Sequence, residues 1–359
     1  MTHGSAGQLP LSVLDTSPIV AGSDARAALR NTVDLARLAD RLGYHRYWVP
    51  EHHGMRGVAC SATAVVVDRI AGETDRIRVG SGGVLLPNHS PLVVAEQFGT
   101  LEAFHPGRID LGLGRALGGN PRVVEHVRPE RDRTATSFAE QVDELLGYFR
   151  PAADRPVRAV PAPGNVPAVW VLGSGGSSAR LAAAAGLPYA FAHHLQPGNA
   201  AEALRTYRDG AVAAGTTGTT GTTGTTGTTG TTPRVIVSVS VIVADTDGRA
   251  EWLAGSTRLK VLSRRRGRRI LLTHPEDAAR HVYTDDDRAL IAETSDAVVC
   301  GSPDTVTDRL RELVADTGAD ELMITSPIHD HADRRRSYEL LAGTAAALRR
   351  SGPAGAPRR

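Results

Sequence analysis

Three adjacent side chains, Glu51, His52 and His53, follow the apolar residues 47–49 and a single proline. Carboxylate and imidazole groups at the end of a strand can ligate a metal, transfer protons or line a cofactor pocket. Successive strand residues point to opposite faces, so the two histidines are poorly placed to share one ion. The chain also has no His-Glu-x-x-His or paired Cys-x-x-Cys spacing. We therefore expect no metal, while a purely structural role for both histidines stays open.

Glycine-rich clusters follow further along the chain, at residues 80–86, 111–119 and 172–179. Strand interiors disfavour glycine unless a bulge or a flat ligand requires it, although a tight turn explains any one cluster. Arg115 could hold a phosphate with its planar fork of donors. The last cluster precedes an expected helix, whose N-terminal N–H groups attract anions. Together the clusters predict a flat, phosphorylated cofactor.

Two further groups are candidates for contact with a substrate. His193 and His194 lie at the end of the expected strand 188–195, and Asp15 ends the expected strand 11–15. Each group also has a purely structural interpretation. The histidine pair could be solvent-exposed, and the Asp15 side chain could start a turn.

Apolar, β-branched runs alternate along the chain with stretches of helical periodicity. The expected strands are residues 11–15, 44–49, 77–86, 108–114, 168–173, 188–195, 234–244 and 321–327. The expected helices are residues 24–42 (with Ser23 as N-cap), 61–71, 91–104, 134–149, 177–186, 199–213 and 303–318. This alternation predicts an α/β fold, a TIM-like (β/α)8 barrel with functional groups at the carboxyl ends of the strands. An open doubly wound sheet is the rival, but no glycine-rich turn follows the first strand.

We expect one barrel domain over residues 1–359, interrupted by two segments. Residues 215–232 are six tandem Gly-Thr-Thr copies and predict a flexible surface loop. Residues 247–300 form a long excursion that we interpret as a lid or a partner surface. Its arginine-rich part, 264–269, fits a solvated helix face, a reductase contact or an anionic substrate contact.

Composition narrows the class of protein. The formal net charge of +2 gives no global field for nucleic acid or an anionic membrane. Two cysteines do not make a disulfide framework, and the N-terminus lacks the basic and apolar regions of a signal peptide. No stretch reaches the ~18 apolar residues of a membrane helix. We therefore expect a cytoplasmic protein.

The sequence resembles the bacterial luciferase-like, flavin-dependent monooxygenases over most of its length. The motifs that carry the likeness are RLGYHRYWVPEHHG, RIRVGSGGVLLPNHSPLVVAEQFGTLEAFHPGRIDLGLGRALG and VWVLGSGGSSARLAAAAGLPYAFAHHL. The resemblance implies a TIM-like barrel with insertions and reduced FMN bound at the carboxyl ends of the strands. It assigns the histidine pair 52–53 to the flavin and substrate, with His53 preferred as the catalytic one.

The resemblance also assigns the remaining contacts. It implies a non-prolyl cis peptide beside the flavin at Gly82-Gly83 and a phosphate contact for Arg115. The phosphate loop would be formed by five consecutive residues, Ser174, Gly175, Gly176, Ser177 and Ser178. Two departures, Gly114 for the reactive cysteine of the luciferases and Ser174 for their glutamate, argue against light emission and aldehyde specificity.

We therefore expect an FMN-dependent monooxygenase that oxygenates a small organic substrate, such as a specialised metabolite. Reduced FMN would come from a separate flavin reductase, because the chain shows no nicotinamide-binding fingerprint. The resemblance implies a dimer, most simply a homodimer. Two alternatives stay open: a deazaflavin-dependent oxidoreductase on the same fold, and a non-catalytic flavin-binding subunit.

Overall fold

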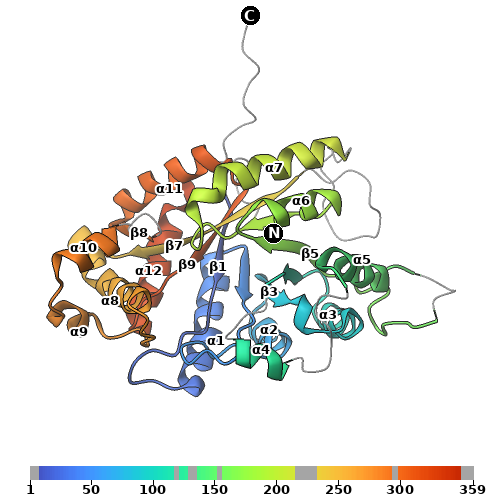
Figure 1. Cartoon of the computed structure of the whole chain (residues 1–359), viewed down its shortest axis with the longest axis horizontal. Coiled ribbons are helices and arrows are strands. Elements are labelled where there is room, and N and C mark those ends of the chain that lie inside the picture. Colours follow the sequence, from blue (N-terminus) through green and yellow to red (C-terminus); the bar gives the residue numbers. More distant parts are fainter. Residues whose placement is uncertain are drawn as a thin grey trace, which may run out of the picture.

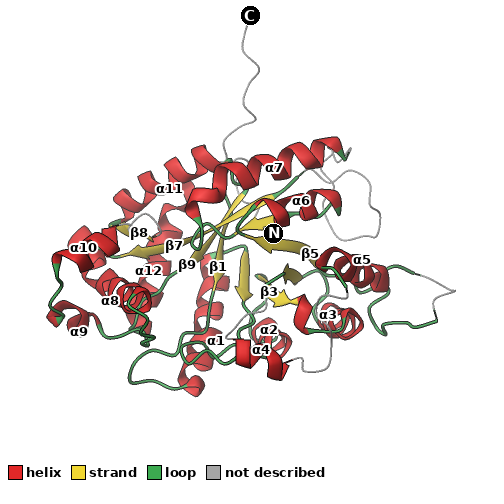
Figure 2. Ribbon diagram, viewed as in Figure 1, coloured by secondary structure: helices red, strands yellow, loops and turns green. Residues whose placement is uncertain are grey.

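The computed structural model describes residues 8–116, 121–127, 136–151, 156–214, 233–292 and 298–348. Eight parallel strands close into a barrel in the order β1-β2-β3-β4-β5-β6-β7-β9, and β9 pairs with β1 to complete the circle. The strands are β1 (Leu11–Leu14), β2 (Arg46–Val49), β3 (Arg78–Leu85), β4 (Ile109–Gly114), β5 (Ala168–Gly173), β6 (Tyr189–Phe191), β7 (Val235–Val243) and β9 (Glu321–Thr325). This confirms the predicted TIM-like barrel and excludes the open sheet (Figures 1 and 2).

A ninth strand, β8 (Val298–Gly301), was not predicted. Ser240 of β7 pairs with Thr325 of β9 and also with Val298 of β8, so β8 lies on the edge of β7 opposite β9. Strand β6 occupies the start of that same edge but ends at Phe191. The expected strand 188–195 is therefore too long, and β8 takes over where β6 stops.

Helices surround the barrel, as Figure 1 shows. They are α1 (Ala25–Leu42), α2 (Thr63–Ala71), α3 (Pro91–Phe104), α4 (Pro121–Val127), α5 (Phe138–Phe149), α6 (Gly176–Ala184), α7 (Ala200–Ala213), α8 (Asp247–Arg265), α9 (Pro275–Arg280), α10 (Asp285–Ala292), α11 (Pro303–Thr317) and α12 (His331–Thr344). Asp24, rather than the expected Ser23, caps α1, because its carboxylate accepts the N–H of Ala27 at 2.8 Å. Among the described residues, no helix is long and apolar enough to span a membrane.

The main core lies between the strands and the helices, and a smaller apolar layer fills the barrel itself. In that inner layer Trp48 and Trp170 meet edge-on, with ring centroids 5.7 Å apart. Strand alternation explains the division, because every second residue of a barrel strand points inward.

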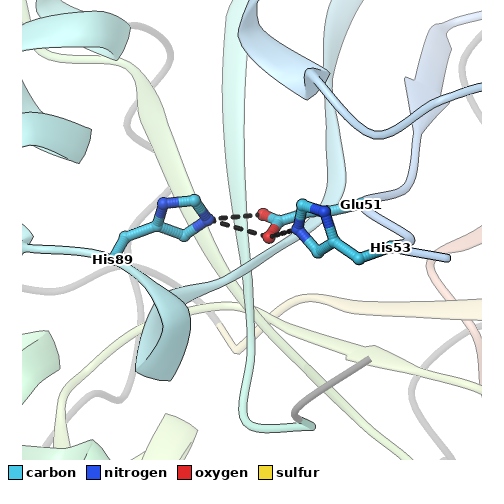
Figure 3. Close-up of side chains that lie close together, drawn as sticks. All are labelled: Glu51, His53 and His89. Carbon is cyan, nitrogen blue, oxygen red and sulfur yellow. Dashed lines mark hydrogen bonds and ion pairs between the residues drawn. The ribbon is translucent and has the colours of Figure 1, made fainter. Parts of the chain in front are cut away.

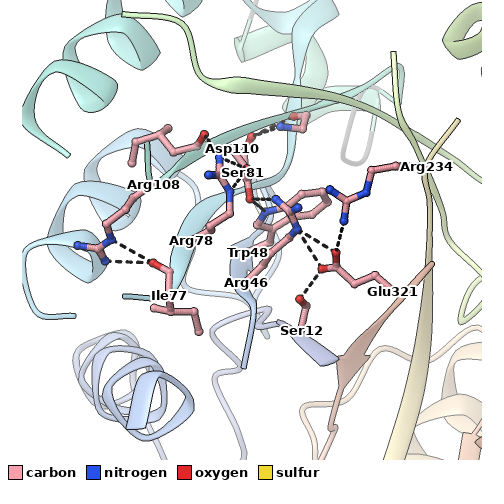
Figure 4. Close-up of polar contacts among 12 residues, drawn as sticks. Ser12, Arg46, Trp48, Ile77, Arg78, Ser81, Arg108, Asp110, Arg234 and Glu321 are labelled. Atoms are coloured by element: carbon pink, nitrogen blue, oxygen red, sulfur yellow. Dashed lines mark hydrogen bonds and ion pairs between the residues drawn. The ribbon is translucent and has the colours of Figure 1, made fainter. Parts of the chain in front are cut away.

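A buried ionic network closes the amino-terminal end of the barrel (Figure 4). Arg46 contacts Asp110 at 2.7 Å and Glu321 at 3.0 Å, and all three side chains are almost fully buried. Arg78 adds a second contact to Asp110 at 2.7 Å. Burial disfavours both carboxylates, but Arg46 with its neighbouring cations holds the pKa of Asp110 and of Glu321 below the ordinary values. With this end closed, the carboxyl ends of the strands are the open face for a ligand.

The 247–300 segment contains α8, α9, α10 and β8, and it packs against loops at the carboxyl ends of the strands. Leu272 forms a bridge with Val20 after β1, and Thr257 donates to the carbonyl of Pro327 after β9 at 2.9 Å. This position suits the proposed lid. The Gly-Thr-Thr loop 215–232 lies outside the described residues.

Candidate active site at the carboxyl ends of the strands

A carboxylate and two imidazoles meet where β2 and β3 end (Figure 3). Glu51 is 3% exposed, and its Oε1 lies 2.7 Å from Nε2 of His53 and 2.8 Å from Nε2 of His89. The two histidines are 21% and 30% exposed, so each ring has one side in solvent. Because β2 and β3 are parallel neighbours, their ends bring Glu51 and His89 together although 38 residues separate them.

The backbone of β3 holds the Glu51 side chain in place. The N–H of Leu85 donates to Oε2 of Glu51 at 3.1 Å, and the N–H of Glu51 donates to the carbonyl of Gly83 at 3.3 Å. Burial alone would raise the pKa of this carboxyl, but the hydrogen bonds from His89, His53 and Leu85 outweigh it and hold the pKa below its ordinary value. Glu51 is therefore an ionised acceptor near neutral pH.

His52 turns away from this cluster. Its backbone N–H donates to the carbonyl of Cys60, and its Nδ1 is buried with no hydrogen-bond partner among the described residues. Burial lowers the pKa of His52, so the ring is neutral near pH 7. The predicted pair 52–53 therefore divides, and His53 shares Glu51 with His89 instead.

The peptide bond between Gly82 and Gly83 is cis, as the resemblance implied. A Cβ on Gly82 would lie 2.8 Å from Leu14, and one on Gly83 would lie 2.6 Å from the carbonyl oxygen of Gly112. Close packing of the barrel thus accounts for glycine at both positions, independently of any ligand.

Arg115 follows β4 directly and is exposed. On the next strand of the barrel, β5 ends at Gly173, and Gly175 is the N-cap of α6. A Cβ on Gly175 or Gly176 would meet no atom closer than 3.4 Å, so the approach to this helix terminus is open. The first N–H groups of a helix have no intrahelical acceptor and suit an anion.

The side chains of the 174–178 loop only partly match their predicted role. Ser178 is turned into the protein, where its hydroxyl donates to the carbonyl of Gly175 at 2.8 Å and lies 3.1 Å from the Tyr189 hydroxyl. Its hydroxyl therefore supports the loop, and a phosphate contact for Ser178 remains a prediction. Ser177 is exposed, and the carbonyl of Ser174 accepts a hydrogen bond from Asn199 at 2.9 Å.

His193 and His194 lie in a turn after β6 rather than at its end. Nδ1 of His193 is buried with no partner in the described part of the chain. His194 lies 2.8 Å from the hydroxyl of Ser238, and burial lowers the pKa of His194 to about 4. His193 is thus the one of the two with an unused polar atom.

Asp15 does not fit the predicted contact with a substrate. It is fully buried, and its carboxylate contacts Arg334 at 2.7 Å, the Tyr47 hydroxyl at 2.6 Å and the N–H of Ser17 at 2.8 Å. The last of these contacts is the side-chain turn that sequence reasoning left as the alternative.

Glu51, His53 and His89 also form the only group of metal-ligating side chains recognised within the described ranges. Two histidines and a carboxylate can bind iron or zinc. Here, however, the nitrogen–oxygen distances of 2.7–2.9 Å are those of hydrogen bonds. The expectation of no metal remains a prediction.

Comparisons with known proteins bear on the family of this chain. A family profile described as luciferase-like monooxygenase matches residues 10–321. The chain is 43% identical to the Bacillus subtilis protein YvbT, over 95% of this chain and 98% of that one. It is 39% identical to the Escherichia coli K12 luciferase-like monooxygenase, over 92% and 96%. The crystal structure of apo-MsnO8 superposes with a TM-score of 0.81 at 38% identity, covering 96% of this chain and all of that one.

Proposed function

Because the chain belongs to the luciferase-like monooxygenase family, we propose that it oxygenates a small organic substrate with reduced FMN and molecular oxygen. The observation that carries the proposal is a run of neighbouring strands, β2 to β5, with His53 after β2, Arg115 after β4 and the α6 N-terminus after β5. Their order along the barrel sets an acid–base group at one side of the open face and anion-binding groups at the other.

The residues at this face suit a flavin mononucleotide. Arg115 and the N-terminus of α6 supply a cation and free N–H groups for a phosphate. The buried, unpaired Nδ1 atoms of His52 and His193 offer polar partners that the described residues leave unsatisfied. Unsatisfied buried polar atoms are costly, and a bound polar group at this face would satisfy these two.

Bound reduced FMN would supply the electrons that activate oxygen. The protein would bind the phosphate through Arg115 and α6 and orient the substrate beneath the 247–300 segment. His53, hydrogen-bonded through Nε2, would exchange a proton with substrate through its other nitrogen. The ionic network around Arg46 would exclude water from the opposite end.

Structural neighbours illustrate two cofactors for this fold. The oxygenating constituent of 3,6-diketocamphane monooxygenase, solved with FMN, superposes at a TM-score of 0.70 and 22% identity. A secondary alcohol dehydrogenase with an F420–acetone adduct superposes at 0.65 and 14% identity. At these identities they support the fold alone, so FMN is our proposal and a deazaflavin its competitor.

The test compares the two cofactors directly. Purified protein is titrated anaerobically with reduced FMN and with reduced deazaflavin, and oxygen consumption is then followed on adding air. We expect saturable binding of FMN and substrate-dependent oxygen uptake. Preference for deazaflavin would replace the proposal by the alternative oxidoreductase, and FMN binding without any oxygen uptake would indicate a non-catalytic subunit.

We also propose a cytoplasmic homodimer that receives reduced FMN from a separate reductase. Three apolar side chains on α2 and α3 are exposed: Val65, Val93 and Phe104. Val93 and Phe104 are 11 residues apart on α3, which places them on one helix face. Such a surface suits contact with a second copy. Analytical ultracentrifugation of the wild type and of Phe104→Glu tests it, with dissociation expected in the variant.

A further inference from the structure

Glu51 stands between two histidines rather than beside one. Its Oε1 is within 2.7 Å of Nε2 of His53 and 2.8 Å of Nε2 of His89, and its Oε2 is 2.9 Å from the same His89 atom. The carboxylate is buried, whereas both rings are partly open to solvent. Figure 3 shows the three side chains in line, with the carboxylate in the middle.

The charge state of the carboxylate decides the tautomer of both rings. Ionised Glu51 has only acceptor atoms, and a third hydrogen bond comes from the N–H of Leu85. The ring nitrogen that faces it must therefore carry a hydrogen in His53 and in His89. In each neutral ring Nδ1 is then the unprotonated nitrogen, with a lone pair that can accept a proton.

We propose that Glu51 is a positioning residue that locks His53 and His89 into one hydrogen-bonded unit, with Nε2–H of both rings on the carboxylate and both Nδ1 atoms left to exchange protons with the substrate. The part concerning the substrate rests on the function proposed above. His89, which follows β3, thereby becomes a catalytic candidate alongside His53, and His52 stands outside the unit.

Sharing one oxygen couples the two rings. A change in the hydrogen bond from either ring alters Oε1 as an acceptor for the other ring, so the two rings respond together. The other titratable groups that interact with Glu51 are His52 and Cys60, whose thiol has a pKa raised to about 12 by burial. Both stay neutral near pH 7, so neither places a charge beside the unit.

The first experiment is independent of flavin. Nitrogen-15 histidine spectra of the flavin-free protein report the tautomer of each ring, with His53→Asn and His89→Asn assigning the signals. We expect Nε2–H for both rings in the wild type and loss of that preference in both rings of Glu51→Gln. Glu51→Asp, which keeps the charge but shortens the reach, should keep the preference in part and serves if the glutamine variant folds poorly.

A matched control uses another histidine–carboxylate pair. His105 contacts Asp68 at 3.0 Å beyond the C-terminus of α3, at the opposite end of the barrel. Asp68→Asn should alter the His105 signal alone and leave oxygenation unchanged. If Glu51→Gln alters one ring or neither, the coupled unit is refuted. Stoichiometric Zn²⁺ binding that disappears in Glu51→Gln would also refute it, in favour of a metal site.

The second experiment reads the reaction. Glu51→Gln should lower kcat by about 10²-fold, the scale of general acid–base catalysis, with the Kd for FMN unchanged and a shifted pH–rate profile. Equal kcat and an unshifted profile would overturn the catalytic part. If the tautomers respond as expected but FMN never binds, the proposed flavin function fails while the Glu51 unit stands.

Discussion

Replacing Arg46 by methionine should strongly destabilise the barrel at neutral pH. Arg46 donates from Nη1 to Asp110 at 2.7 Å and from Nε to Glu321 at 3.0 and 3.1 Å. Removing one partner of a buried ion pair costs about 3–5 kcal/mol. Two pairs are broken here, but Arg78 remains 2.7 Å from Asp110 and Arg234 remains 3.5 Å from Glu321. We therefore expect a loss of about 4 kcal/mol in the free energy of unfolding at pH 7.

The loss should shrink on acidification. In the folded wild type the pKa values of Asp110 and Glu321 lie below their ordinary values of 3.8 and 4.5. The two carboxylates therefore contribute their full stabilisation above the ordinary values, and this stabilisation is lost as the pH falls through the folded pKa values. Without Arg46 the pKa values of both carboxyls rise, so acidification protonates them and relieves the uncompensated charges. The difference between variant and wild type should accordingly be smaller at pH 4.5 than at pH 7.

Urea unfolding followed by tryptophan fluorescence measures both quantities, since Trp48 and Trp170 lie in the barrel beside the network. The control is Arg280→Met, which removes an exposed arginine 3.7 Å from Glu276 and should leave the urea midpoint unchanged. A loss in Arg46→Met of less than about 1 kcal/mol, below the range for a broken buried pair, would refute the reasoning. Equal losses at the two pH values would refute the role of the carboxylates.

Three further predictions concern single positions. Arg115→Gln should raise the Kd for FMN by about 10–100-fold, the scale of a lost charged hydrogen bond. Fluorescence titrations should show unchanged binding of riboflavin, which has no phosphate. Equal weakening of both ligands would contradict a phosphate contact. Gly80→Ala should lower the melting temperature markedly, because its Cβ would lie 2.2 Å from the Asp110 carbonyl oxygen, whereas Gly176→Ala meets nothing closer than 3.4 Å and should melt like the wild type. Wild-type stability should fall as the pH drops from about 6.5 towards 4, because His194 is neutral when folded and gains a proton on unfolding. His194→Gln should lose that part of the pH dependence. An unchanged dependence of stability on pH in the variant would contradict this role of His194.

The alternation of strands and helices was readable because parallel barrel strands are apolar and bounded by helices of clear periodicity. Helix α3 and strand β5 have the predicted bounds, residues 91–104 and 168–173. Strand β8 was missed although it contains two adjacent valines, because an apolar run of four residues is too short to identify a strand inside a polar excursion. They become a strand only because β6 ends early and leaves an edge of β7 free.

The site was predictable at the level of strand ends but not of side-chain partners. The order of motifs located His53 and the glycine clusters, since neighbouring parallel strands end on one face. The contact of His89 with Glu51 depends on the turn after β3, which the sequence does not specify. The buried pairing of Asp15 with Arg334 joins residues 319 positions apart, beyond the reach of any local pattern.

Strand β8 also bears on how this enzyme could be re-engineered. The 247–300 segment leaves the barrel after Val243 and returns to pair with residues 240–243 of the same strand. Its two attachment points therefore lie side by side and share one seam on β7, while the rest of the segment contacts the loops after β1 and β9. A chimaera that takes α8 to α10 from a relative but retains β8 would keep that seam intact. Because we propose that this segment covers the substrate, the chimaera would test whether it sets the substrate range without a change to the barrel.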